Sequence, residues 1–238
     1  MRFRQHVQSL HRWLALALMA QVTLWMASGV VMSLLPIEYV RGENAIAFAA
    51  PVDLEVQNYF PPAGVIADAG GAREVTLKRW LGRDVYVVRG EWGAALFDAD
   101  SGERISPISE QQARQVAVAD FSGDDAVERV RMLNKPPHEA AGRGALWRVE
   151  FADADKTRIY VSPDTGDVVA RRNRVWRLYD FFWMLHIMDY RERENFNNPL
   201  VRTFALTGLL FALSGVLLVA FRLQGGRYAD DMARMTKK

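Results

Sequence analysis

Four histidines are the side chains of this chain best suited to hold a metal: His6, His11, His138 and His186. A neutral imidazole offers a nitrogen lone pair and is a good ligand for haem iron. The chain has no cysteine, which excludes disulfides, thiolate metal sites, iron–sulfur clusters and covalently attached haem. His138 follows two prolines and is expected on a surface loop. His11 and His186 adjoin apolar segments, which makes them the candidate ligands.

Two long uncharged segments must position these histidines. Residues 13–35 form a run of 23 without a charge, and residues 203–221 form a run of 19. A helix of the second length is roughly 28 Å long, close to the hydrocarbon thickness of a bilayer. Both segments are therefore predicted to span a membrane. The first is longer than the apolar core of a signal peptide, which favours an uncleaved anchor and leaves a cleaved signal as the alternative.

Basic residues predict the orientation of the two spans. Arg2, Arg4 and Arg12 precede the first span without an acid, and the tail from Arg222 carries five Lys and Arg against two Asp. Because Lys and Arg concentrate on the cytoplasmic side, both termini are expected in the cytoplasm and residues 36 to about 175 outside it. The net charge of +2 is too small to suggest nucleic acid as a partner.

The predicted placement separates the two candidate histidines. His11 and His186 are expected near opposite membrane faces, roughly 30 Å apart, so they cannot hold the same iron. His6 is a poor second ligand because it lies about 140° from His11 around a helix. A bis-histidine site would need a ligand from a second copy or a partner chain. The simpler interpretation is that both are interfacial side chains with an apolar body and a wet tip.

Small residues give the spans a means to associate. Gly29 and Ser33 lie four residues apart in the first span, and Gly208, Ala212 and Gly215 share adjoining positions in the second. Such residues let helices approach closely in lipid, which favours a dimer. Packing of the two spans on each other is the alternative. Before the second span, residues 174–192 are crowded with aromatics and predict an amphipathic helix at the outer interface.

The polar middle of the chain contains a repeat. Residues 100–103 (Asp-Ser-Gly-Glu) and 164–167 (Asp-Thr-Gly-Asp) are 64 residues apart, and each follows a β-rich hairpin. Asp can bond its own backbone two residues on and Gly supplies positive φ, so each tetrapeptide predicts a tight turn. Turn chemistry also accounts for the four acids, which are not taken as a catalytic pair. Two copies of strand–turn–strand–turn–strand predict two small antiparallel units.

A helix is expected between these units. Ser109 and Gln112 form a capping-box pattern, and apolar residues follow at helical spacing, which predicts a helix over residues 110–119 that covers a sheet. The expected strands are residues 86–88, 94–97, a strand near 105, 127–133, 146–151, 157–161 and 168–169. The pattern is that of an α+β domain between two spans.

Several of these segments resemble one known family. Residues 158–169 (R-I-Y-V-S-P-D-T-G-D-V-V) resemble the closing hairpin of a PepSY domain. Residues 174–190, with Leu-His at 185–186, resemble the junction of PepSY-associated transmembrane proteins. Residues 10–14 (L-H-R-W-L) and 27–29 (A-S-G) resemble that family's first span. Many members have four or more spans, whereas this chain has two, so a four-helix bundle would require a partner or a second copy.

The resemblance implies a bacterial inner-membrane protein with an extracytoplasmic PepSY module. Such modules are linked to peptidase inhibition or ligand sensing, and some multi-span relatives are haem-containing membrane reductases that act on siderophore-bound iron. One hypothesis is an electron-transfer or accessory subunit that binds haem b through His11 and His186, as a homodimer or with a membrane partner. The other is a non-catalytic extracytoplasmic module that binds or regulates a partner protein or peptidase.

No stand-alone catalytic motif is present. The chain has no nucleophile elbow, phosphate loop, dinucleotide fingerprint or zinc helix, so an enzymatic role is left open only as a subunit of a membrane reductase. The predicted fold class is an α+β membrane protein, in which two transmembrane helices flank tandem PepSY-like units of antiparallel sheet and helix. The predicted segments are a cytoplasmic N-terminus (1–12), transmembrane helix (13–35), first unit (36–122), second unit (123–173), interfacial helix (174–192), transmembrane helix (201–223) and cytoplasmic tail (224–238).

Overall fold

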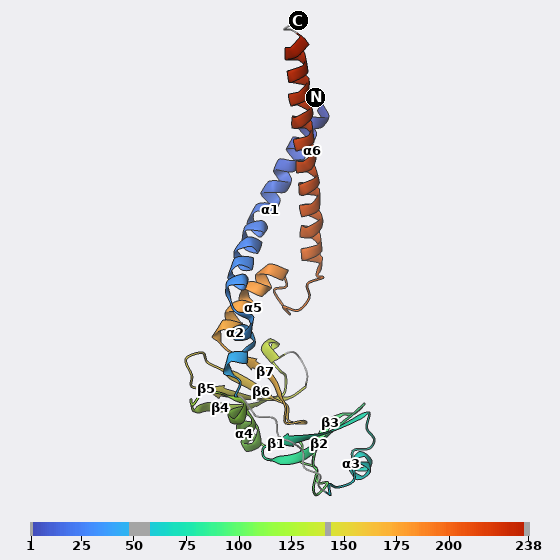
Figure 1. Ribbon diagram of the computed structural model, residues 1–238, viewed down its shortest axis with the longest axis vertical. Coiled ribbons are helices and arrows are strands. Elements are labelled where there is room, and N and C mark those ends of the chain that lie inside the picture. The colour runs from blue at the N-terminus through green and yellow to red at the C-terminus, as the bar shows by residue number, and fades with distance from the viewer. Residues whose placement is uncertain (1, 48–57, 141–143, 236–238) are drawn as a thin grey trace. The chain divides into compact units, whose positions relative to one another are not determined.

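The protein is an α+β chain in which an apolar helix at each end flanks two antiparallel sheets (Figure 1). The computed structural model describes residues 2–47, 58–140 and 144–235. The chain divides into two compact units, one made of Met1–Leu34 with Asp180–Lys238 and the other of Leu35–Tyr179. The division falls inside one helix, α5 (Arg174–Ile187).

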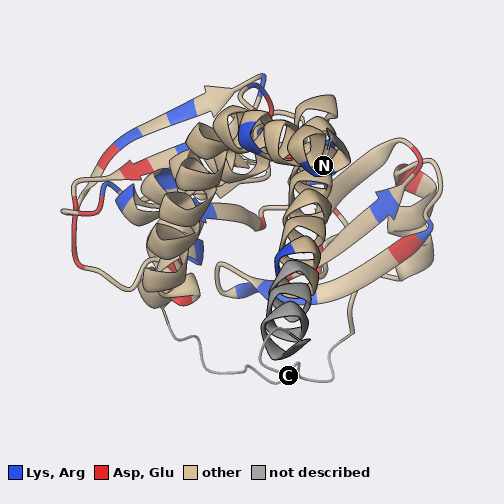
Figure 2. Ribbon diagram, turned by 90° about the horizontal axis from the view of Figure 1, so that it is seen from above, with Lys and Arg blue, Asp and Glu red and all other residues tan. Residues whose placement is uncertain are grey.

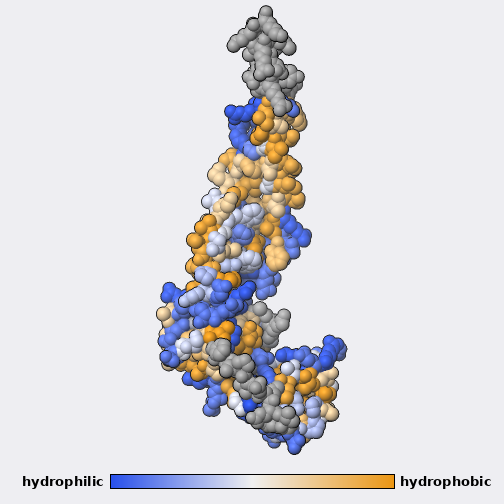
Figure 3. Space-filling view, in the orientation of Figure 1, coloured by the Kyte–Doolittle hydropathy of each residue, from blue (hydrophilic) through white to orange (hydrophobic). Residues whose placement is uncertain are grey.

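The first unit is built on two long helices that pack side by side, α1 (Arg2–Leu34) and α6 (Pro199–Met235). Within them, Phe3–Leu34 and Pro199–Gln224 are long and apolar enough to cross a membrane. Large apolar side chains lie open on their surfaces, with Leu34 74% exposed and Val216 66% exposed. Figure 3 shows this apolar surface along both helices. Exposed apolar surface of this extent marks a site of membrane or protein contact.

A short linker joins the end of α5 to the start of α6. Helix α5 ends at Ile187, where Met188 adopts a left-handed φ of 54°, so the aromatic helix is shorter than the predicted 174–192. Asn198 then caps α6, because its Oδ1 accepts the N–H of Val201 at 2.9 Å while its Nδ2 donates to the carbonyl of Ile187 at 2.9 Å. Pro199 follows at the first helical position, where its fixed φ and missing N–H are tolerated. One amide side chain therefore fixes both helix ends.

The second unit begins with short helices and a three-stranded sheet. The helices are α2 (Ile37–Arg41), the 3-10 helix η1 (Glu43–Ala45) and α3 (Pro62–Asp68). The sheet has the order β1-β2-β3, from β1 (Glu74–Trp80), β2 (Arg83–Gly90) and β3 (Gly93–Asp98). One face of this sheet, with Tyr86 and Phe97, packs against Val65 of α3. This first part of the second unit is therefore a helix on an antiparallel sheet.

A four-stranded sheet follows, covered by α4 (Glu110–Asp120). Its order is β4-β5-β6-β7, from β4 (Val127–Leu133), β5 (Leu146–Phe151), β6 (Arg158–Val161) and β7 (Val168–Arg172), with the 3-10 helix η2 (His138–Ala140) between β4 and β5. The predicted capping box at the start of α4 is confirmed, since Ser109 accepts from the N–H of Gln112 and Gln112 accepts from that of Ser109.

The two sheets share one hydrophobic core. Side chains from the first sheet, from α4 and from the second sheet form a single buried cluster that includes Trp80, Val87, Leu96, Ala113, Val116, Phe151, Ile159 and Val161. The repeats are therefore packed together and are not separate modules. Figure 2 shows that charged residues gather on the strands and turns, whereas the long helices are largely free of them.

The repeated turns match hydrogen bond for hydrogen bond. In the first, Asp98 Oδ1 accepts the N–H groups of Asp100 and Ser101. In the second, Ser162 Oγ accepts those of Asp164 and Thr165. Each predicted tetrapeptide contains a glycine at positive φ, Gly102 or Gly166, as the sequence predicts. The accepting side chain lies two residues before each tetrapeptide, however, so the expected bonds from the Asp100 and Asp164 carboxylates are replaced by those of Asp98 and Ser162. The strand expected near residue 105 is reduced to an isolated bridge between Phe97 and Arg104.

Candidate functional site

His186 lies in the last turn of α5 and is half-buried. Its ring Nδ1 is 3.0 Å from the hydroxyl of Ser28 on α1. The ring also lies next to Trp25, with centroids 6.3 Å apart, and close to Gly29, where a Cβ would be 3.9 Å from the imidazole Cε1. All of these residues belong to the first compact unit. The sequence placed His186 correctly near an apolar span, but it did not indicate which residues of α1 the ring contacts.

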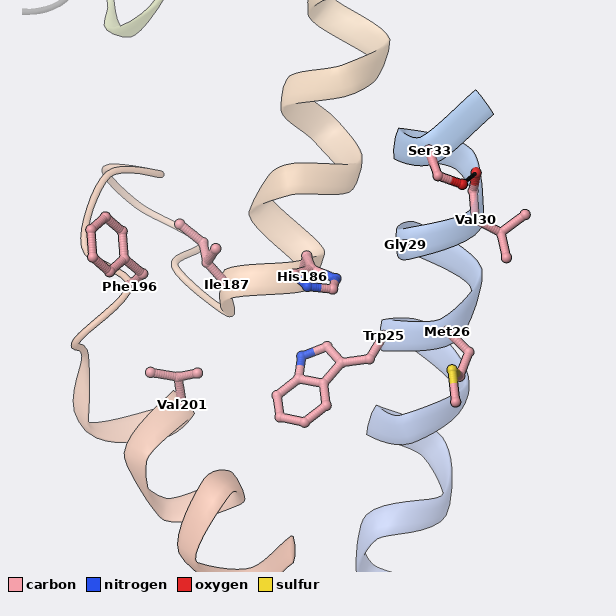
Figure 4. Close-up of a pocket in the computed structure, with 9 residues that line it drawn as sticks. All are labelled: Trp25, Met26, Gly29, Val30, Ser33, His186, Ile187, Phe196 and Val201. Atoms are coloured by element: carbon pink, nitrogen blue, oxygen red, sulfur yellow. Dashed lines mark hydrogen bonds between the residues drawn. The ribbon is translucent and has the colours of Figure 1, made fainter. Parts of the chain in front are cut away.

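An open groove of about 610 Å³ surrounds this imidazole. Its walls are mostly apolar and come from α1, the end of α5, the linker and the start of α6, including Met26, Phe196 and Val201. Figure 4 shows the His186 ring directed toward α1 at Gly29, while the indole of Trp25 projects into the groove. The groove is thus an apolar surface with one imidazole set into it.

His11 has the same kind of partner elsewhere on the helix pair. Its Nδ1 is 2.8 Å from the hydroxyl of Ser214 on α6, and its ring stacks on Phe211 with centroids 4.3 Å apart. A Cβ added at Gly215 would lie 3.3 Å from the His11 Cε1. Among the described residues, Nε2 of neither His11 nor His186 has a hydrogen-bond partner. Each imidazole therefore contacts a serine hydroxyl through Nδ1 alone.

The two imidazoles form separate sites. His11 and Ser28 lie 17 residues apart in the continuous helix α1. That separation is about 26 Å along the helix axis, and His186 contacts Ser28. The expectation that the two histidines cannot share one iron therefore agrees with the geometry. His6 and His138 are both exposed, and His138 lies in the second unit beside Trp176.

The small residues of the spans have specific neighbours. Gly29 and Gly215 face His186 and His11, whereas a Cβ at Gly208 would meet nothing within 4 Å among the described residues. Sequence reasoning missed the roles of Ser28 and Ser214 as histidine partners. The available signal was the tripeptide Ser-Gly-Val, which occurs in both apolar segments, at 28–30 and 214–216.

The linker that ends the groove is fastened by charged and aromatic side chains. Trp183 Nε1 donates to the carbonyl of Arg193 at 3.0 Å, and Arg193 forms an ion pair with the buried carboxylate of Asp180. Asp189 accepts backbone N–H groups further along the linker, the strongest from Asn195, and these bonds lower the pKa of its carboxyl. The groove wall next to His186 is therefore held in place from several sides.

Comparisons with protein-family models, with curated proteins and with solved structures find no match to this chain. The resemblance to PepSY-associated transmembrane proteins therefore stays a prediction. What the chain does must be inferred from the geometry of its own residues.

Proposed function

We propose that this chain is a bacterial inner-membrane protein that binds haem b and serves as an electron-transfer or accessory subunit. The observation that carries the proposal is the groove at His186, where one imidazole is set into an apolar surface and its Nε2 has no hydrogen-bond partner among the described residues. Bound haem b would supply one-electron chemistry at its iron. The role proposed for His186 is to ligate that iron through Nε2.

The donor set fits a metal that brings most of its own ligands. Among the residues that the structure describes, no group of three or more His, Asp or Glu side chains could hold a metal ion. A lone imidazole is suited instead to a porphyrin iron, which needs only axial ligands from the protein. The groove volume of about 610 Å³ is of the size that small-molecule and cofactor sites have. The apolar walls would cover the porphyrin faces.

His11 is proposed as the ligand of a second haem near the other membrane face. Since the two histidines are about 26 Å apart along α1, each iron would receive one ligand from this chain. A six-coordinate centre would then require a residue from a second copy or from a membrane partner. A symmetric dimer would offer each histidine its own counterpart, as closed two-fold interfaces do.

The domain outside the helix pair is proposed to be extracytoplasmic and PepSY-like. Two observations support this assignment: each sheet carries a helix on one face, and the two turns repeat with the same hydrogen bonds. The apolar lengths of Phe3–Leu34 and Pro199–Gln224 support a place in the membrane for the helices that flank it.

The first prediction concerns the cofactor. Full-length protein produced with ample haem and purified in mild detergent should show the reduced-minus-oxidised bands of haem b. His186→Ala and His11→Ala should each remove about half of the haem if each anchors one centre. His138→Ala is the matched control, because His138 is exposed and belongs to the second unit, and it should retain all of the haem. A colourless wild-type protein would overturn the proposal in favour of a partner-binding module.

A further inference from the structure

A short motif occurs twice in this chain and is paired crosswise. Leu-His at 10–11 is followed by Ser-Gly-Val at 28–30, and Leu-His at 185–186 is followed by Ser-Gly-Val at 214–216. The histidine of the first copy contacts the serine of the second, and the histidine of the second contacts the serine of the first. The two contacts are therefore equivalent, and each joins the N-terminal segment to the C-terminal segment of the first unit.

With each hydroxyl hydrogen donated to a helix carbonyl, the two serines act toward the imidazoles as acceptors. Ser28 Oγ donates to the backbone carbonyl of Trp25 at 3.0 Å, and Ser214 Oγ donates to that of Phe211 at 2.7 Å. A hydroxyl has one hydrogen to donate and lone pairs left to accept. The arrangement that satisfies both contacts has a proton on Nδ1 of each facing histidine. In a neutral imidazole, Nε2 then carries the free lone pair.

The glycine after Ser214 lets the His11 ring approach closely, whereas the one after Ser28 leaves the His186 ring at an ordinary contact distance. A Cβ at Gly215 would lie 3.3 Å from the His11 Cε1, which is tighter than an ordinary contact, and one at Gly29 would lie 3.9 Å from the His186 Cε1. Burial strengthens the arrangement, since Ser28 is 1% exposed and Ser214 is 4% exposed. Water therefore does not compete for the lone pairs that these hydroxyls present to the imidazoles.

We propose that each Ser-Gly pair is a seat that fixes the facing histidine in the Nδ1-protonated tautomer. In this tautomer, the free lone pair lies on Nε2 of both His11 and His186, and Nε2 is therefore the nitrogen available to bind a metal. Ser28 and Ser214 are thus positioning residues that act through the histidines. Their effect on haem rests on the proposed function, whereas their effect on the tautomer does not.

The tautomer can be measured without any cofactor. In full-length, haem-free protein labelled with ¹⁵N-histidine and held in micelles at about pH 8, where histidine side chains are ordinarily neutral, nitrogen chemical shifts distinguish protonated from unprotonated ring nitrogens. His11 and His186 should both show protonated Nδ1 and unprotonated Nε2. Ser28→Ala should change the signals of His186 alone, and Ser214→Ala those of His11 alone. His11→Gln and His186→Gln variants assign the signals.

Ser33→Ala is the matched control. Ser33 lies on the same helix, lines the same groove and makes the same hydroxyl bond, to the carbonyl of Val30 at 2.8 Å, but no histidine is bonded to it. It should leave every imidazole signal in place. Protonated Nε2 on either ring of the wild type, or unchanged signals of His186 in Ser28→Ala, would overturn the inference.

A second readout ties the seat to the metal. In protein reconstituted with haem, Ser28→Ala should weaken haem binding about tenfold or more, as loss of an outer partner of a ligating histidine does. It should also raise the midpoint potential of one haem, because the imidazole without an acceptor on Nδ1 is a weaker donor to ferric iron. A coloured wild type in which Ser28→Ala changes neither value would contradict the seat. A colourless wild type with the expected nitrogen shifts would instead contradict the proposed function and leave the seat standing.

Discussion

Glycine acts in two different ways in this protein. At Gly215 the backbone is helical, and the missing Cβ leaves room for the edge of the His11 imidazole, whose Cε1 would lie 3.3 Å from a Cβ. At Gly102 and Gly166 the backbone is left-handed, with φ of 75° and 66°, a conformation that glycine adopts without steric cost. The second role was readable from the Asp-Ser/Thr-Gly-acid pattern, because turn chemistry is local. The first depends on which ring lies opposite, and so it could not be read from the sequence.

A prediction at this scale concerns Gly166. A Cβ there would meet the indole Nε1 of Trp80 at 2.5 Å, in addition to the strain at positive φ. Gly166→Val should therefore lower the free energy of unfolding by about 1 kcal/mol or more. Gly102→Val should do likewise, since its Cβ would meet Phe60 at 2.5 Å. Urea unfolding of the full chain in detergent, followed by tryptophan fluorescence, measures the change.

Gly82 offers a control that separates the cost of backbone strain from the cost of a steric clash. It has a φ of 82°, but a Cβ there would meet nothing within 4 Å among the described residues. Gly82→Val should cost only the backbone strain, and hence less than Gly166→Val. Unchanged stability in both the Gly102 and Gly166 variants would remove the paired-turn interpretation.

Some helices and strands follow from local sequence patterns, whereas others depend on contacts with residues far away in the chain. Strands β4 and β5 and helix α4 were predicted nearly to the residue, because alternation and a capping box are local signals. Strand β1 was not predicted. It carries Lys78, which pairs with Asp167, and Trp80, whose indole donates to the carbonyl of Gly166 at 3.1 Å. The strand itself pairs with β2 across the short connection Leu81-Gly82, and these side-chain partners nearly ninety residues away add to that pairing. No local pattern in the sequence reports the distant partners.

The two matching turns allow a prediction about acid stability. Burial tends to raise the pKa of Asp98, but N–H bonds from Ser101 and Asp100 outweigh it and leave the pKa below its ordinary value. The ionised form is therefore the stabilising one. Its contribution is present above the unfolded pKa of about 3.9 and is lost as the pH falls through the lower folded value. Ser162 holds the equivalent place and does not titrate.

Asp98→Ser copies the second turn into the first and tests this. The variant should lose less stability than the wild type between about pH 5 and pH 2, because one of the acid-sensitive carboxylates is gone. Urea midpoints of the full chain across that range give the comparison, and Ser162→Ala is a control that should leave the slope with pH unchanged. An identical slope in Asp98→Ser and the wild type would show that the Asp98 bonds do not contribute.

At the scale of the whole chain, the candidate site is made by residues that the sequence separates widely. His11 meets a serine 203 positions away, and His186 meets one 158 positions away. Composition and hydropathy were enough to predict two apolar helices and to select these two histidines. They could not predict that each imidazole would face a buried hydroxyl, because such a contact depends on how α1, α5 and α6 pack. The repeated Ser-Gly-Val is the one trace of it in the sequence.

The last prediction concerns the topology of the chain. Basic residues precede the first apolar helix and follow the second, and such residues stay in the cytoplasm. If both helices span, the residues between them are expected on the far side of the membrane. A reporter that is active only outside the cytoplasm should be silent when fused after Lys238. The same reporter should be active when inserted near Asp124, in the exposed segment between α4 and β4. A reporter active only in the cytoplasm should give the opposite pattern at both positions. If the Asp124 fusion is silent and the Lys238 fusion active, the orientation is reversed. If both are silent, the helices do not span, and a membrane site for haem at His186 is excluded with them.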